Sequence, residues 1–139
     1  METLQWLRTL EPFKLDEQLF SEACKSGHLE VLKWLRSEDC PWDAYTCSGA
    51  AGGGHLEVLK WLRSEGCPWS ERACYYAAEG GQLDVLKWLR SEGCPWNLMT
   101  CDVAALNGHL DVLKWAIDNG CPYEVTEMTR GALQSLGLA

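Results

Sequence analysis

The chain has 139 residues, of which 47% are hydrophobic and 23% charged, values typical of one folded domain and not of a disordered segment. Its 12 basic and 20 acidic residues give a formal net charge of -8, which repels the phosphates of nucleic acids and anionic membranes. The sequence has no apolar run of about 18 to 20 residues that could span a bilayer, and no secretory signal at its start. We therefore expect a cytoplasmic protein that binds neither nucleic acid nor a membrane.

A phrase of sixteen residues occurs four times, beginning at Gly27, Gly54, Gly81 and Gly108, so the sequence repeats every 27 residues. The second copy reads GHLEVLKWLRSEGCPW, and the first differs from it at one position. A fixed period of this length is typical of chains that stack one small unit on the next, because such a unit cannot bury its apolar face alone. The repeat predicts an all-α helical repeat solenoid of stacked helix-turn-helix units.

The units, taken in chain order, are predicted to form a single domain over 1–139. Before the first full unit, the stretch LQWLRTL at Leu4 to Leu10 resembles the VLKWLRS of the later copies, which predicts an opening half-unit. After the last full unit, polar residues such as Thr129 predict a closing first helix whose outer face meets water. The predicted boundaries are 1–15 for the N-terminal half-unit, 16–42, 43–69, 70–96 and 97–123 for the full units, and 124–139 for the C-terminal half-unit. This division predicts ten short helices.

The third unit shows most clearly how the first helix of each unit is defined. Ser70 can accept a hydrogen bond from the first helical turn, and Asp or Asn stands at the equivalent places of the other units. Cys74, Ala77 and Ala78 form a narrow stripe of small residues, which predicts close approach of a neighbouring helix. Gly81 ends this helix.

The second helix of the same unit, from about Gln82 to Glu92, is predicted to be amphipathic. Its predicted apolar face consists of Leu83, Val85, Leu86, Trp88 and Leu89. The charged residues Asp84, Lys87 and Arg90 are expected to face solvent. Gly93 and Pro95 end the helix in a short Cys-Pro-Trp loop.

The run A-A-x-x-G-H-L-E-V-L-K, from Ala50 to Lys60, resembles the inner part of the ankyrin repeat, and the similarity covers Asp16 to Gln134. The usual ankyrin unit has 33 residues and opens with T-P-L-H-x-A, a signature that is missing here. Six residues are absent between Trp69 and Cys74, where the family has its projecting β-hairpin. The resemblance implies shortened, 27-residue ankyrin-like repeats whose binding surface is reduced to the inner helices.

Eight cysteines and three histidines raise the question of disulfides or a metal. Cysteines at equivalent places of neighbouring units are a helix spacing of about 8 to 10 Å apart, which is farther than the roughly 4.4 to 6.8 Å of a disulfide. We expect reduced, buried thiols; a bond such as Cys67 to Cys74 is left open. His28, His55 and His109 share their place with Gln82, a poor metal ligand, so we expect them to bond turn carbonyls and expect no metal or other cofactor.

Seven of the eight tryptophans also recur at fixed places. They are Trp34, Trp61, Trp88 and Trp115 on the second helices and Trp42, Trp69 and Trp96 in the loops. Residues copied into every unit serve the contact that every unit makes, so packing is a better explanation than ligand stacking. Uniform Cys and His positions likewise give no single nucleophile and base, and we expect no catalytic residues and no enzyme activity.

Variation between the units is concentrated on the first helices, whereas the second helices hardly change. A uniform scaffold with a variable surface is typical of a recognition module, although neutral drift of exposed positions explains variation equally well. We expect a monomer that binds a protein partner through the variable positions. The candidate partner-binding residues are Lys25, Tyr45, Arg72, Tyr75, Tyr76, Glu79, Met99, Asp102 and Leu106.

Three other classes remain open from the sequence. An adaptor could present substrates to a ligase, but only about 15 residues precede the repeats. A metal- or redox-responsive Cys/His protein is a second class. The near-identity of the middle copies suggests a third, an artificial or recently duplicated repeat scaffold with no dedicated ligand.

Overall fold

The computed structural model describes residues 16–43 and 45–139. The predicted half-unit over 1–15, with Trp6, lies outside the described residues. Within them the chain forms nine helices and no strand, so the prediction of an all-helical fold is confirmed for this part. No helix in the same part is long and apolar enough to cross a membrane.

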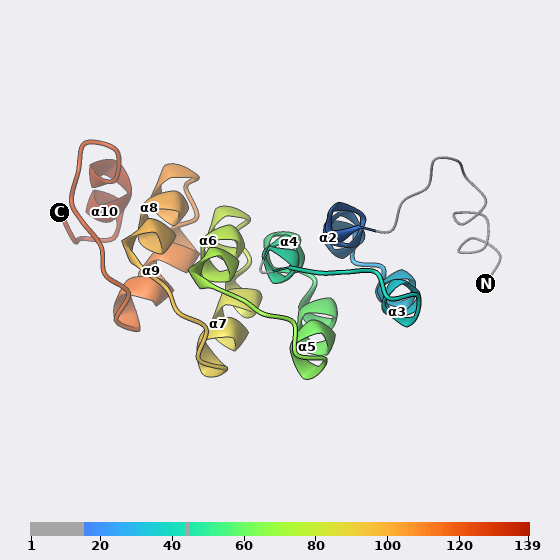
Figure 1. Cartoon of the computed structure of the whole chain (residues 1–139). Helices are drawn as coiled ribbons and strands as arrows, with labels where there is room; N and C mark the ends of the chain where they lie inside the picture. Colours follow the sequence, from blue (N-terminus) through green and yellow to red (C-terminus); the bar gives the residue numbers. More distant parts are fainter. Residues whose placement is uncertain (1–15, 44) are drawn as a thin grey trace.

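The helices form two rows in Figure 1. In chain order they are α2 (Glu17–Ser26), α3 (Leu29–Ser37), α4 (Thr46–Gly52), α5 (Leu56–Ser64), α6 (Glu71–Glu79), α7 (Leu83–Ser91), α8 (Leu98–Leu106), α9 (Leu110–Asp118) and α10 (Arg130–Ser135). The even-numbered helices are the first helices and make one row; the odd-numbered ones are the second helices and make the other. Each first helix packs on the next first helix, and from α2 to α8 on the second helix of its own unit.

The first helices begin at the predicted cap residues. The side chains of Asp16, Ser70 and Asn97 accept hydrogen bonds from backbone N-H groups of the first turn at 2.9, 3.3 and 2.9 Å. Asp43 accepts one at 2.9 Å just before α4. The cap prediction is confirmed in all four full units, and it explains why each first helix starts where it does.

The core lies between the two rows and combines small and large side chains. Ala50, Ala77 and Ala104 on the first helices are completely buried, so neighbouring first helices approach closely. Leu59 and Leu86 on the second helices are completely buried against them. The predicted inward face of the second helix is confirmed.

A polar contact joins each unit to the one before it at the turn between its helices. Nε2 of His55 donates to the carbonyl oxygen of Lys25 at 2.7 Å, and Nε2 of His109 donates to that of Glu79 at 3.0 Å. Gln82 makes the equivalent bond from its amide nitrogen, at 3.3 Å. The prediction that this column bonds turn carbonyls is confirmed for these three residues, and the carbonyl belongs in each case to the preceding unit.

The prediction that Arg90 faces solvent is wrong. Its guanidinium carbon lies 4.2 Å from the ring centroid of Trp96, and its Nη1 donates to the carbonyl oxygen of Cys94 at 2.6 Å. The equivalent arginines of the first two units lie 3.7 and 3.9 Å from their loop tryptophans. A guanidinium on an indole face is an attractive contact, so this arginine fixes the Cys-Pro-Trp loop against the second helix.

The loop tryptophans connect successive units. Each packs edge-on against the second-helix tryptophan of the next unit, with ring centroids 6.3 Å apart for Trp42 and Trp61, 5.9 Å for Trp69 and Trp88, and 5.9 Å for Trp96 and Trp115. Edge-to-face pairs of this kind are favourable beyond the area they bury. The prediction that the tryptophans serve packing is confirmed for these six.

The closing half-unit differs from its prediction. The expected first helix is reduced to α10, and Met128, expected at a core place, is 69% exposed. Thr129, expected to face water, is 4% exposed; its hydroxyl donates to the carbonyl oxygen of Glu124 at 2.8 Å and accepts from Thr126 N-H at 2.9 Å. These hydroxyl bonds hold the segment before α10 in a turn, which moves the helix start toward the C-terminus.

Two glycines of the third unit separate backbone strain from contact between units. Gly93 has φ +84° and open space where a Cβ would stand, whereas a Cβ on Gly81, at φ +68°, would lie 2.8 Å from the His109 ring. We expect Gly93→Ala to lower the free energy of unfolding by about 1 to 2 kcal/mol, the cost of a left-handed Cβ. Gly81→Ala should lower it by about 1 kcal/mol more, because His109 must also give up its hydrogen bond. Urea unfolding followed by circular dichroism measures both.

The control is the same pair of substitutions in a His109→Ala background. There the extra cost of Gly81→Ala should disappear, since the ring that it displaces is gone. An extra cost that persisted would place its origin in the backbone of the turn and contradict the proposed contact between units.

Candidate functional site

The first-helix surface, meaning the exposed faces of α2, α4, α6 and α8, carries the candidate residues. Three of them are large apolar side chains that remain in solvent: Tyr45, Met99 and Leu106 are 52%, 47% and 51% exposed. Lys25, Arg72, Glu79 are also exposed, and the other candidates are half-buried. The predicted positions are therefore accessible on one side of the molecule.

A hollow of about 500 Å³ opens over α4, between α2 and α6, and is called here the α4 hollow. Candidate residues Lys25, Tyr45, Tyr76 and Glu79 line it. Its remaining lining consists of small residues: Ser21, Ser48, Gly49, Gly52, Gly53 and Gly80. The hollow exists because α4 presents glycines where its neighbours present long side chains.

A second hollow, of about 340 Å³, lies between α6 and α8 and is called here the α6/α8 hollow. Its lining includes the candidates Arg72, Tyr75, Tyr76 and Met99, together with Glu71 and Asn97. Tyr76 belongs to both hollows, so they adjoin one another. Seven of the nine candidate residues thus line two neighbouring depressions.

Aromatic contacts hold the border between the hollows in place. The rings of Tyr75 and Tyr76 meet edge to face with centroids 5.2 Å apart. Arg72 lies over the ring of Tyr45, 4.9 Å from its centroid, so a residue of α6 contacts one that precedes α4. These contacts preorganise large side chains at the surface, which lowers the entropy cost of binding with them.

Two candidate residues lie outside the hollows. Leu106 is at the C-terminal end of α8, and Asp102 is half-buried in the middle of that helix. Oδ1 of Asp102 is buried without a hydrogen-bond partner. Burial and the nearby Glu124 carboxylate raise the pKa of Asp102.

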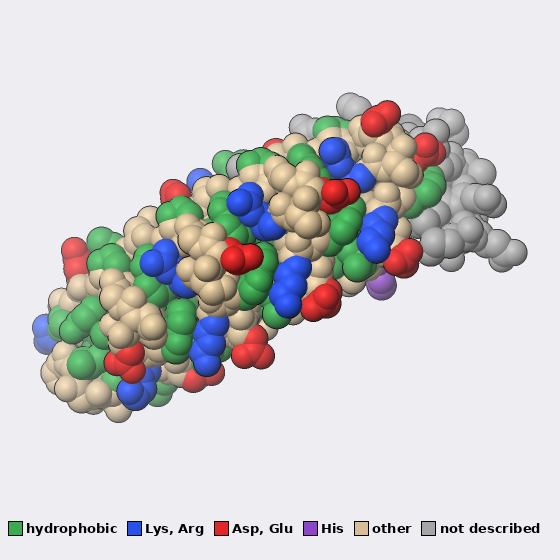
Figure 2. Space-filling view, turned by 90° about the horizontal axis from the view of Figure 1, so that it is seen from below, with side chains coloured by type: hydrophobic (Ala, Val, Ile, Leu, Met, Phe, Trp, Pro, Cys, Tyr) green, Lys and Arg blue, Asp and Glu red, His purple; other side chains and the backbone are tan. Residues whose placement is uncertain are grey.

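The opposite side of the molecule, formed by the second helices, has a different character. Figure 2 views this side and shows Lys and Arg mixed with Asp and Glu along its length. Exposed pairs such as Lys60 with Glu57, 3.7 Å apart, contribute little to stability. A hollow of about 480 Å³ on this side is lined by repeated residues including Arg63, Trp69 and Trp88, which already contact one another. This side is a solvated, repeated face.

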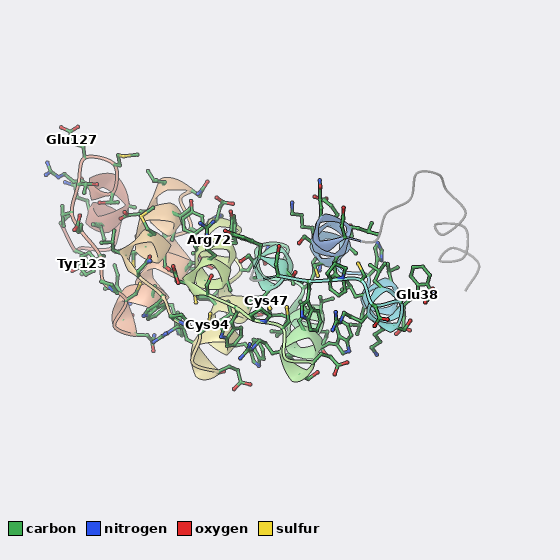
Figure 3. The ribbon with its side chains drawn as sticks, viewed as in Figure 1. Glu38, Cys47, Arg72, Cys94, Tyr123 and Glu127 are labelled. Carbon is green, nitrogen blue, oxygen red and sulfur yellow. The ribbon has the colours of Figure 1, made fainter. Side chains whose placement is uncertain are left out.

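All eight cysteines are buried and free of disulfide bonds. Figure 3 shows Cys47 and Cys94 between the two rows of helices, while Arg72 lies on α6 away from the second-helix row. The thiol of Cys94 donates to the carbonyl oxygen of Ser70 at 3.4 Å, and equivalent bonds of 3.3, 3.9 and 3.4 Å recur in the other units. The loop cysteine therefore ties the end of each unit to its own beginning.

The thiol neighbours differ from the pair that the sequence left open. Cys74 hydrogen-bonds to Cys94 of its own unit, and Cys67 to Cys47 of its own unit, so the interacting pairs are not Cys67 with Cys74. The hydrogen bond from Cys94 and burial raise the pKa of Cys74. Burial, with the nearby Cys47, also raises the pKa of Cys24. Such thiols stay protonated at neutral pH and are poor nucleophiles.

The described residues contain no group of three or more His, Cys, Asp or Glu side chains placed to hold a metal ion. Comparison of the chain with protein-family models and with curated proteins finds no match. The residues that sequence reasoning missed are Ser48, Gly49 and Gly52 in the α4 hollow. Their signal was available, because glycine at an exposed helical place differs from the large residues of the other units.

We expect the thiols to be reduced and protected in the folded protein. A thiol reagent such as Ellman's reagent at pH 8 should count all eight cysteines after unfolding without reductant, and should react slowly with the native protein because burial keeps the thiols protonated. Glutathione serves as the fast-reacting control. A count of about four or fewer in the unfolded protein, or immediate reaction of the native one, would contradict the assignment of these residues to the core.

Proposed function

We propose that the chain is a non-enzymatic protein-interaction module, built as an ankyrin-like helical repeat solenoid, that binds a protein partner through its first-helix surface. The observation that carries the proposal is the position of the variable residues: seven of the nine candidates line two adjoining hollows on one side. The residues that are copied between units make the core and the unit-to-unit contacts instead.

The composition of this surface suits protein recognition. Tyr45, Tyr75, Tyr76 and Arg72 are of the residue types that contribute most to binding energy at protein interfaces. Met99 adds a flexible apolar side chain that adapts to a partner. Acidic and basic residues stand around these side chains, as in the polar rim of an interface.

The ankyrin-like part of the proposal rests on the order of the elements. Each full unit has a capped first helix, a glycine turn, an antiparallel-type second helix and a loop, and the units pack in chain order. The place of the ankyrin β-hairpin is taken by a Cys-Pro-Trp loop that packs on the next unit. A solenoid without hairpins leaves the first-helix surface as its recognition face.

The remaining parts of the proposal concern the setting. We infer a monomer that acts in the cytoplasm without a cofactor, since eight buried thiols suit a reducing compartment. The net charge of -8 makes a neutral or basic protein region a better partner than a nucleic acid or an anionic membrane.

Alanine substitution on the first-helix surface should weaken binding of a natural partner, isolated by affinity capture from the source cell and then purified. Because central aromatic and Arg side chains dominate interface energies, the strongest of Arg72→Ala, Tyr75→Ala and Met99→Ala should cost more than about 2 kcal/mol. Isothermal titration calorimetry measures the loss for each variant.

The matched controls are Glu57→Ala, Lys60→Ala and Lys87→Ala on the second helices, which should change the affinity by less than about 0.5 kcal/mol. The reverse ranking would place the binding face on the second-helix side. A chain for which no captured protein distinguishes the wild type from the first-helix variants would be a repeat scaffold without a dedicated ligand.

A further inference from the structure

We propose that the α4 hollow receives a tyrosine side chain of the partner protein. The inference rests on the proposed function and makes it specific, since it assigns one hollow to one kind of side chain. Three features carry it: the glycine floor of the hollow, the balance of charge around it, and a buried serine hydroxyl without a hydrogen-bond partner.

The glycine floor is not required by helix packing. Gly52 stands where α2, α6 and α8 carry Lys25, Glu79 and Leu106, and a Cβ on it would meet the Cβ of Tyr76 at 3.4 Å, an ordinary van der Waals distance. A larger residue therefore fits the backbone, and glycine inside a helix is unfavourable. Close approach of a ligand to the backbone gives a reason for keeping it.

The walls of the hollow favour a neutral aromatic ring. Tyr45 and Tyr76 are the aromatic side chains of the lining. Lys25 and Glu79 contribute one charge of each sign, so neither a cation nor an anion is favoured by the total. Lys25 is also already paired with Glu22 at 3.3 Å, which reduces what it offers to a carboxylate. The volume of about 500 Å³ is ample for one aromatic side chain.

Ser48 selects a ring that carries a hydroxyl. This serine lines the hollow and is 3% exposed, and its Oγ has no hydrogen-bond partner. A buried polar atom without a partner is rare in folded proteins and is commonly explained by a missing ligand or water. Rotation about the Cα-Cβ bond turns the hydroxyl toward the hollow, where a phenol oxygen can donate to it or accept from it. A phenylalanine ring would leave it unpaired.

Small analogues of side chains test the hollow without the partner. The probes are p-cresol for tyrosine, toluene for phenylalanine and n-propylguanidinium for arginine, each titrated into the ¹⁵N-labelled full chain and followed by NMR. We expect p-cresol to shift the backbone amides of Gly49, Gly52 and Gly53 saturably, with a dissociation constant about fivefold lower than that of toluene, as one neutral hydrogen bond gives. Equal affinity for toluene, or tighter binding of the guanidinium, would overturn the assignment.

Two variants separate the floor from the hydroxyl. Gly52→Leu places in α4 the residue that α8 carries at the same place as Leu106, so it should fold normally and abolish the p-cresol shifts. Ser48→Ala should keep the hollow but reduce p-cresol to the affinity of toluene. Lys87→Leu, on the second-helix side, adds a leucine away from the hollow and should change neither. Shifts that survive Gly52→Leu, or a p-cresol preference that survives Ser48→Ala, would contradict the inference.

The purified partner distinguishes this inference from the proposed function. If Gly52→Leu weakens the partner at least tenfold, as does replacement of one partner tyrosine by phenylalanine, the hollow is a tyrosine site. If the partner tolerates Gly52→Leu but is lost with Tyr75→Ala, the first-helix surface still binds it and the tyrosine assignment is wrong. Amide shifts in the hollow that depend on protein concentration alone would assign it to a second copy of this chain and also overturn the inference.

Discussion

Close packing of one first helix on the next is the constraint on which the rest of the structure depends. A unit of 27 residues has too little interior to fold alone, so its apolar surface must be covered by its neighbours. Completely buried alanines such as Ala77 allow the first helices to approach, and buried leucines such as Leu86 fill the wider space beneath them. The same constraint fixes the glycine turn: a Cβ on Gly81 would collide with His109, the residue that bonds this unit to the next.

The short loop shows how a repeat can lose a hairpin and keep its neighbours in place. The arginine at the end of the second helix holds the loop tryptophan, which meets the second-helix tryptophan of the following unit, while the loop cysteine bonds to the start of its own unit. These parts depend on one another. In the fourth unit Ile117 stands in the place of the arginine and Tyr123 in that of the loop tryptophan, so both halves of the stacking contact are absent together.

Periodicity made the helices, the caps and the inward face predictable from the sequence, because each is set by local chemistry that every unit repeats. Contacts between units were harder to predict. Arg90 was wrongly expected in solvent because a charge at an outward helical place gives no sign of the indole that folds back over it. The closing helix was misplaced because Thr126 and Thr129 satisfy the backbone with their hydroxyls before α10 begins. The candidate surface followed from variation between units, whereas the hollows depend on which small residue faces which large neighbour.

The repeat also explains why the surface can be specific although the scaffold is uniform. Every first helix places its exposed residues at the same height and orientation, so a hollow forms wherever one unit has small residues between neighbours with large ones. In α4 the glycines at 49 and 52 lie beside Lys25 on one side and Tyr76 on the other. The cost in helix stability is confined to α4, because tertiary packing and not intrinsic propensity holds a helix of seven residues. A solenoid can therefore change the shape of its surface in one unit while the contacts between units stay the same.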